Sequence, residues 1–272
     1  MSVAPRLAAA FAAPRAQRAA LIPYFTGGWP DLETSHRLMT EVIEAGADVV
    51  ELGVPFSDPV ADGPVVQRST HEALLAGITP DDVFDVASAH SADVPFVLLA
   101  YANTVLAYGP AGFFARASGC GVEAVVIPDL PVDEMTSPLG GGPALLDVAL
   151  AQGLALVPLA APTSTDVRLD LVAKAARAFV YCVAVTGVTG VRAELGDELP
   201  TLVERLRART AVPLVAGFGI STAEQAGAVA GIADGVIMGS ALIAAAAEAE
   251  GADGACGAVG ALLRAAAAAI AG

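Results

Sequence analysis

Residues 47–64 read ADVVELGVPFSDPVADGP, and the fold prediction starts from this stretch. Its first half is a short apolar run that carries Glu51, and its second half is a proline-rich loop with Asp58 and Asp62. The stretch contains no lysine or arginine that could neutralise these carboxylates. A short apolar run bounded by glycine and proline predicts a buried β-strand, so the sequence places an unpaired acid at the end of a strand.

Seven further apolar runs of similar length occur along the chain. They are ALIPYFT (20–26), PFVLLAY (95–101), VEAVVIP (122–128), LALVPLA (154–160), AFVYCVA (178–184), VPLVAGFG (212–219) and ADGVIMGS (233–240). They are apolar throughout, which is typical of parallel strands buried on both faces. Amphipathic segments such as DLETSHRLMTEVIEAG (31–46) lie between them and predict helices. Eight strand–helix repeats predict an α/β fold, a (β/α)8 TIM barrel.

The predicted barrel is a single domain over residues 1–272, in which residues 1–19 form an extra N-terminal helix or a partly flexible segment. A doubly wound sheet usually has a GxGxxG motif after its first strand, and TGGWPD (26–31) does not match it. The stretch MTSPLGGGP (135–143) predicts a flexible surface loop. Asp31 and Ser221 are predicted to cap helices, Ser221 as part of a capping box with Glu224.

The composition excludes some classes of partner. The net charge of −15 argues against binding to nucleic acid or to an anionic membrane surface. No apolar run reaches the roughly 18 residues of a membrane span, and the alanine-rich tail predicts a surface helix. A small-molecule phosphate substrate stays compatible with this charge, because backbone N–H groups can bind an anion on an acidic protein.

The cysteines and histidines suggest no metal or disulfide site. The chain has three cysteines, Cys120, Cys182 and Cys256, and they form no CxxC motif. The sequence therefore predicts neither a disulfide framework nor a zinc site. This cysteine usage predicts a reducing, cytoplasmic location. The chain has three histidines, at positions 36, 71 and 90, which are predicted to be surface or packing residues.

Two carboxylates are candidates for catalysis, because the working residues of such barrels lie where strands end. Glu51 follows an apolar run, and partial desolvation there raises its pKa and suits it to proton transfer. Asp62 lies on the following loop, which is predicted to be more solvated, so it stays ionised and can take a different role. The alternatives are a salt bridge for Glu51 and a turn position for Asp62 in ADGP.

Glycine-rich loops follow three of the predicted strands. They are TGVTG (186–190), GFGIS (217–221) and MGSA (238–241). Glycine lets the backbone approach an anion closely, and phosphate sites in these barrels lie after strands 7 and 8. The last two loops therefore predict a phosphate site built from backbone N–H groups, with tight turns as the alternative. The long loop at 183–196 is predicted to be a mobile lid, with an ordinary surface loop as the alternative.

The motifs ELGVPFSDPVADGP, YAN, PDLPVDE, TGVTG, GFGIS and MGSA occur in this order, and together the chain closely resembles the tryptophan synthase alpha subunit over about residues 21–244. The resemblance implies a lyase that cleaves indole-3-glycerol phosphate to indole and glyceraldehyde 3-phosphate. It implies no cofactor and no metal in this subunit. By this resemblance Glu51 is the acid–base catalyst, and Asp62 stabilises positive charge on the indole nitrogen.

The resemblance also assigns binding residues. Substrate binding is expected of Tyr24, Tyr101, Tyr181, Thr189 and Phe218, and phosphate binding of Gly190, Gly217, Gly219, Gly239 and Ser240. The chain departs from the family pattern in three places. Tyr24 stands where phenylalanine is expected, Val185 where an arginine is common, and SPLGGGP looks like an insertion.

The partner that the resemblance implies is the tryptophan synthase beta subunit, which holds pyridoxal phosphate and receives indole through a tunnel in an α2β2 tetramer. The expected docking segments are 55–58, 103–108 and 129–133. Three alternatives stay open from the residues: a stand-alone lyase that releases indole, a non-catalytic barrel that binds phosphate ligands and regulates a partner, and another phosphate-binding barrel such as a sugar-phosphate isomerase.

Overall fold

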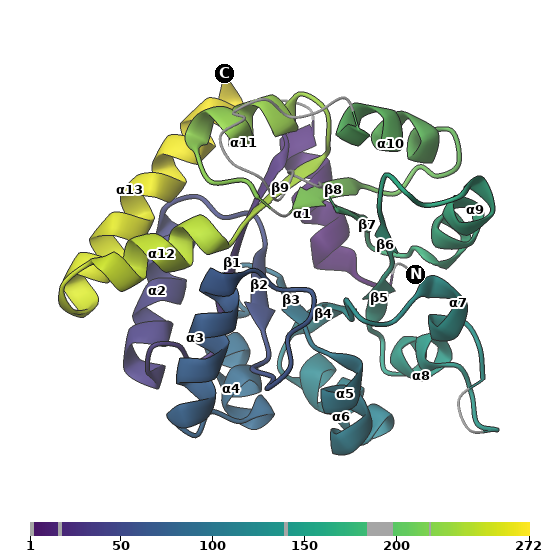
Figure 1. Cartoon of the computed structure of the whole chain (residues 1–272), viewed down its shortest axis with the longest axis horizontal. Helices are drawn as coiled ribbons and strands as arrows, with labels where there is room; N and C mark the ends of the chain where they lie inside the picture. Colours follow the sequence, from purple (N-terminus) through teal and green to yellow (C-terminus); the bar gives the residue numbers. More distant parts are fainter. Residues whose placement is uncertain (1–2, 16–17, 139–140, 184–197, 218) are drawn as a thin grey trace.

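The structure is a computed structural model that describes residues 3–15, 18–138, 141–183, 198–217 and 219–272, the side chains of 13–15 excepted. Parallel strands form a ring, and helices surround it (Figure 1). The strands are β1 (Ala20–Thr26), β2 (Val50–Gly53), β3 (Phe96–Leu99), β4 (Val122–Val126), β5 (Ala155–Val157), β6 (Leu159–Ala160), β7 (Val180–Val183), β8 (Leu214–Gly217) and β9 (Gly235–Met238).

The order of the strands closes the barrel. The sheet runs β5-β4-β3-β2-β1-β9-β8-β7-β6, so its two ends are β5 and β6. Only Pro158 separates these two strands, and its carbonyl accepts a hydrogen bond from the Tyr181 N–H at 3.0 Å. One predicted strand, 154–160, is therefore split because proline has no N–H to donate to the ladder. When β5 and β6 are counted as the one predicted strand, the barrel has eight strands, and the predicted (β/α)8 barrel is confirmed.

The helices cover the outside of the barrel (Figure 1). They are α1 (Pro5–Arg15), α2 (Leu32–Glu44), α3 (Pro64–Leu75), α4 (Pro80–His90), α5 (Ala102–Tyr108), α6 (Pro110–Gly119), α7 (Val132–Met135), α8 (Leu145–Ala151), α9 (Asp166–Ala175), α10 (Glu198–Arg207), α11 (Ala223–Ala230), α12 (Ser240–Glu248) and α13 (Gly251–Ala271). Their apolar faces and the strands share one buried cluster. Whether the whole chain is one domain stays a prediction.

The extra N-terminal helix, α1, closes the end of the barrel where the strands begin. The Glu123 carboxylate at the start of β4 accepts the N–H groups of Arg6 and Leu7 at 3.2 and 2.8 Å. Phe11 is buried and lies against Phe179, which immediately precedes β7, with ring centroids 5.7 Å apart. The open end of the barrel is therefore the one where the strands finish.

Two helix caps test the predicted boundaries. Asp31 caps α2 as predicted, because its carboxylate accepts the Thr34 N–H at 2.9 Å. The predicted cap at Ser221 was wrong by one residue: Thr222 caps α11 and forms the capping box with Gln225. Serine and threonine are both common N-caps and serine is the slightly stronger one, so cap preference alone points to the wrong one of these two adjacent residues.

The C-terminal helix α13 is long and apolar enough to cross a membrane by length and composition alone, which the expectation from apolar runs did not anticipate. In the structure it packs against α2, α11 and α12 and buries one face, including Val259, Leu263 and Ile270. Core helices of soluble proteins pass the same test of length and composition.

The predicted loop at 135–143 begins where α7 ends, and Pro138 and Ala144 pair as an isolated antiparallel bridge.

Candidate active site

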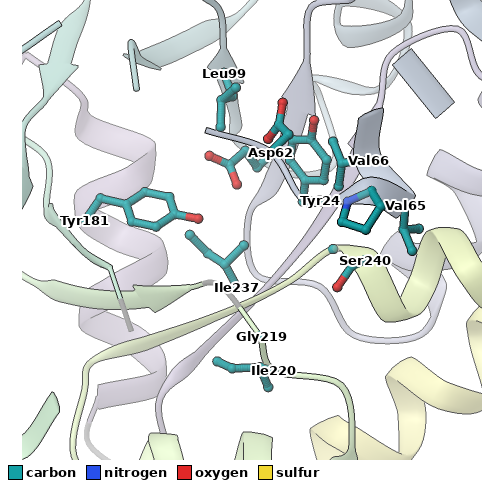
Figure 2. Close-up of a pocket in the computed structure, with 14 residues that line it drawn as sticks. Tyr24, Asp62, Val65, Val66, Leu99, Tyr181, Gly219, Ile220, Ile237 and Ser240 are labelled. Carbon is teal, nitrogen blue, oxygen red and sulfur yellow. The ribbon is translucent and has the colours of Figure 1, made fainter. Parts of the chain in front are cut away.

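A cavity of about 310 Å³ opens at the end of the barrel where the strands finish (Figure 2). It is lined by side chains or backbone of Tyr24, Glu51, Asp62, Gly63, Pro64, Val65, Val66, Leu99, Tyr181, Gly219, Ile220, Ile237, Gly239 and Ser240. Both candidate carboxylates, two of the three predicted tyrosines and three of the predicted phosphate-loop residues therefore meet in one place. Among the residues that the structure describes, none that lines the cavity is a lysine or arginine.

Glu51 lies inside β2, two residues before its end, and is paired in register with Tyr24 of β1 and Val97 of β3. Glu51 is only 1% exposed to solvent. Within the described ranges, neither carboxylate oxygen of Glu51 has a hydrogen-bond partner. Burial, and secondarily the charge of Asp62, raise the pKa of Glu51 to about 8. A buried carboxyl group of this kind is mostly protonated at neutral pH and can donate a proton.

Asp62 is held by a hydrogen bond from a tyrosine on the next strand–helix connection. The Tyr101 hydroxyl donates to Asp62 Oδ2 at 3.0 Å, and the same hydroxyl accepts the Ala61 N–H at 3.0 Å. Burial raises the pKa of Asp62 to about 6, while the bond from Tyr101 lowers it. Asp62 is thus less solvated than the sequence suggested. Its pKa still stays below that of Glu51, so near neutral pH one acid is protonated and the other ionised.

Tyr101 does not line the cavity itself. It is buried at the end of β3, and Phe56 stacks on its ring with centroids 5.0 Å apart and an interplanar angle of 23°. The stacked pair fixes the ring, and the ring fixes the loop that carries Asp62. Tyr101 therefore supports the carboxylate in this structure, whereas the sequence predicted a direct contact with substrate.

Tyr24 and Tyr181 face the cavity from nearly opposite sides, and each needs a glycine on a neighbouring strand (Figure 2). A Cβ built on Gly53 would lie 2.1 Å from the Tyr24 hydroxyl oxygen. A Cβ built on Gly217 would lie 2.4 Å from the Tyr181 hydroxyl oxygen. In both cases the glycine is two residues beyond the register partner of the tyrosine. These glycines admit aromatic rings, which is a role that the sequence reading of GFGIS did not foresee for Gly217.

Burial also sets the protonation state of the two tyrosines. It raises the pKa of Tyr24 and of Tyr181 well above the ordinary value, and the nearby carboxylates raise both further. Both phenols therefore stay protonated at neutral pH and can donate hydrogen bonds. Their rings supply apolar walls, together with Leu99 and Ile237, for a flat hydrophobic group.

The opposite wall of the cavity consists of backbone. Gly219 has a φ of +82°, a conformation that side chains other than glycine rarely adopt. Gly239 is the N-cap of α12, which has nine residues, and as a glycine it offers no side chain to cap the first N–H groups of this helix. A Cβ at Gly239 would meet Tyr24 at 2.9 Å, so glycine is also required there for packing. The free N–H groups and the helix dipole make this wall suitable for an anion.

Some predicted residues lie outside the described ranges. They are Thr189, Gly190 and Phe218, together with Val185 and the rest of the predicted lid from residue 184 to residue 196. The structure adds lining residues that the sequence reading did not single out, namely Pro64, Val65 and Val66 in the first turn of α3. Proline after glycine is a helix-start signal, so Gly63–Pro64 could have indicated that this helix begins at the cavity.

Comparison with known proteins assigns the family. The family model described as tryptophan synthase alpha chain matches residues 11–268. The tryptophan synthase alpha chain of Gluconacetobacter diazotrophicus is 46% identical over 243 residues, which cover 88% of this chain and 86% of the relative. That of Geobacter sp. strain M21 is 44% identical over 226 residues, 82% of each chain.

Solved structures agree with this assignment. A Mycobacterium tuberculosis tryptophan synthase structure superposes with a TM-score of 0.88 at 36% identity, covering 98% of each chain. A tryptophan synthase subunit alpha from Legionella pneumophila superposes with a TM-score of 0.87 at 34% identity, covering 99% of this chain and 98% of the other. The match spans nearly the whole barrel, including both carboxylates and the cavity around them. The chain belongs to the tryptophan synthase alpha chain family.

Proposed function

We propose that this protein is a lyase that cleaves indole-3-glycerol phosphate to indole and glyceraldehyde 3-phosphate, without a cofactor or metal of its own. The observation that carries the proposal is the pairing of Glu51 and Asp62 in one cavity. The first is buried without a hydrogen-bond partner among the described residues, and the second is held by Tyr101. Membership of the tryptophan synthase alpha chain family supports the substrate.

The cavity suits the three parts of this substrate. The apolar wall of Leu99 and Ile237 with the two tyrosine rings fits the indole ring. Asp62 lies on the rim of this space and can accept the indole N–H. The phosphate fits the backbone wall at Gly219, Gly239 and Ser240, where N–H groups substitute for a cationic side chain. Gly190, Gly217, Thr189 and Phe218 remain further candidates from the sequence.

The proposed chemistry uses Glu51 twice. Its carboxyl group protonates indole C3, and positive charge then develops on the ring nitrogen, where the ionised Asp62 stabilises it. The Glu51 carboxylate next removes the proton of the glycerol hydroxyl next to the bond that breaks. The electrons of the C–C bond return to the ring, which restores indole and leaves the aldehyde. One proton is given and one is recovered, so the cycle is closed without any cofactor.

The pKa values support this division of roles. Glu51 must begin protonated and Asp62 ionised, and these two states coexist between about pH 6 and about pH 8. The profile of turnover against pH should therefore be bell-shaped, with apparent pKa values that belong to the coupled pair.

We further propose a tryptophan synthase beta subunit as the partner, with pyridoxal phosphate in that subunit, an α2β2 assembly and a cytoplasmic location. The rim around the cavity supports the docking proposal. Val60, Leu106 and Tyr108 are exposed large apolar side chains on the segments after β2 and β3. The N–H of Ala102, the first residue of α5, donates to Asp129 Oδ1 at 2.9 Å, so the helix that holds segment 103–108 is bonded to segment 129–133.

The first experiment measures indole release from indole-3-glycerol phosphate by the purified chain, with and without a tryptophan synthase beta subunit. Slow release that the partner strongly accelerates is the expected result, because partner binding is expected to favour the closed, active state. Fast release by the chain alone would indicate a stand-alone lyase. No release under either condition would contradict the enzymatic proposal and favour a barrel that only binds phosphate ligands.

A further inference from the structure

Two of the three histidines meet on the outside of the barrel, far apart in sequence. His36 lies in α2 and His90 is the last residue of α4, and these helices pack together (Figure 1). His36 Nδ1 and His90 Nε2 are 3.2 Å apart, and the ring centroids are 5.4 Å apart with an interplanar angle of 37°. Both residues are half-buried, and neither lines the cavity described above. The pair therefore has no part in the proposed cleavage.

The separation of the two nitrogens matches a hydrogen bond between the rings, and it also matches the spacing of two ligands on a shared metal ion. Zn²⁺ binds imidazole nitrogens at about 2.0–2.1 Å, so two of them at tetrahedral positions lie about 3.3 Å apart. The observed 3.2 Å is close to this value. The rings are only partly buried, so a hydrated ion can reach them from solvent and keep water as its remaining ligands.

The charge state of the pair also fits a metal site. Neutral imidazole is the form that binds metals. In the neutral pair one ring donates an N–H to the other. That proton can move to the other nitrogen of its own ring, so metal binding releases no proton. The net charge of −15 attracts cations to the surface in general.

The ligand set points to a transition metal. Imidazole nitrogen suits Zn²⁺, Ni²⁺ and Cu²⁺, whereas Mg²⁺ and Ca²⁺ prefer oxygen. In the described part of the chain no group of three or more His, Cys, Asp or Glu side chains is placed to hold a metal, so the site would have two protein ligands. We propose that His36 and His90 together bind one divalent transition-metal ion, which ties α2 to α4. This inference is independent of the proposed function.

The direct test uses the wild-type chain, freed of any purification tag and of metal. The imidazole proton resonances of its three histidines are followed by NMR during titration with Zn²⁺. Two resonances should shift together with one saturation curve, while that of exposed His71 should not move. Movement of all three to the same extent, or of none, would overturn the proposal, and neither result depends on whether a variant folds.

Variants assign the site. In calorimetric titration with Zn²⁺, His36→Gln and His90→Gln should each lower the affinity about tenfold or more, whereas the matched control His71→Gln should bind as the wild type does. Zn²⁺ should also raise the unfolding temperature of the wild type, because it binds only the native pair. Equal zinc affinity in all four proteins would show that the pair is only a hydrogen bond between helices.

Discussion

At the end of the barrel where the strands begin, Asp48 and Asp234 each accept the N–H of a neighbouring strand, from Leu21 at 2.8 Å and Leu214 at 2.7 Å. Each also pairs with an arginine, Arg18 for Asp48 and Arg207 for Asp234. At the other end, Glu51 is buried with no such partner among the described residues. Asp48 and Asp234, where the strands begin, thus accept several hydrogen bonds, whereas the Glu51 carboxyl group, toward the other end, accepts none from the described residues.

The difference separates stability from chemistry. A carboxylate that accepts a strand N–H and pairs with an arginine, as Asp48 and Asp234 do, holds neighbouring strands together. A carboxylate that lacks donors destabilises its ionised form, and this is the condition that allows it to give and take a proton near neutral pH. The repeated sequence AGAD-VVELG and GIAD-GVIMG places Asp48 and Asp234 at equivalent points, whereas only the first repeat carries a glutamate.

The largest expected effect comes from Glu51→Gln, which keeps the size of the side chain but removes its proton chemistry. Indole release from indole-3-glycerol phosphate should fall by about 10²-fold or more. The matched control is Glu123→Gln, which changes a glutamate at the other end of the barrel. It should leave turnover unchanged and instead weaken the attachment of α1. Equal losses of turnover in the two variants would contradict the assignment of proton transfer to Glu51, at the end of the barrel where the strands finish.

Next in size is the effect of removing an acid where the strands begin. Asp48→Ala leaves the Leu21 N–H and Arg18 without their acceptor, which should lower the free energy of unfolding by about 1–3 kcal/mol. Urea unfolding measures this loss. Turnover per folded molecule should stay the same, so a drop in turnover at full folding would show that this end also takes part in catalysis.

A third prediction concerns pH and stability. The pKa of Glu51 in the folded protein, about 8, lies above the ordinary value of 4.5, so the folded state binds more protons than the unfolded state between these values. Its contribution to stability should therefore be greatest at low pH and be lost as pH rises toward 8. Wild type and Glu51→Gln are compared by urea unfolding across this range. Parallel profiles for the two proteins would contradict the raised pKa.

The smallest effect is expected from Tyr101→Phe. Loss of the bond to Asp62 should raise the pKa of Asp62, move the acid limb of the pH–turnover profile to higher pH and slow turnover roughly tenfold or less. Tyr108→Phe is the matched control, because its hydroxyl bonds Asp81 and not Asp62, and both variants are assayed without a partner since Tyr108 lies in a proposed docking segment. An acid limb that stays in place in Tyr101→Phe would mean that Asp62 does not set it.

The sequence predicted the barrel because strand length, apolar runs and glycine turns are local signals. It also placed both carboxylates, since strand ends converge in such a barrel. It did not predict the split at Pro158, because proline reads as part of an apolar run. It could not show the contact of His36 with His90, which joins residues 54 positions apart. It did not show that Gly217 makes room for the Tyr181 ring, because a glycine that admits a neighbouring ring looks the same in sequence as one that admits an anion, and the phosphate role of Gly217 stays a prediction.

The glycines beside Tyr24 and Tyr181 have a consequence for how this barrel can evolve. Gly53 has space for a side chain only if Tyr24 becomes smaller, and Gly217 only if Tyr181 does. A larger residue at Gly53 or Gly217 is therefore expected to be tolerated only when the facing tyrosine is replaced by a smaller residue at the same time. A library that varies the two positions together can reshape the cavity walls, whereas one that scans single positions will record both glycines as immutable.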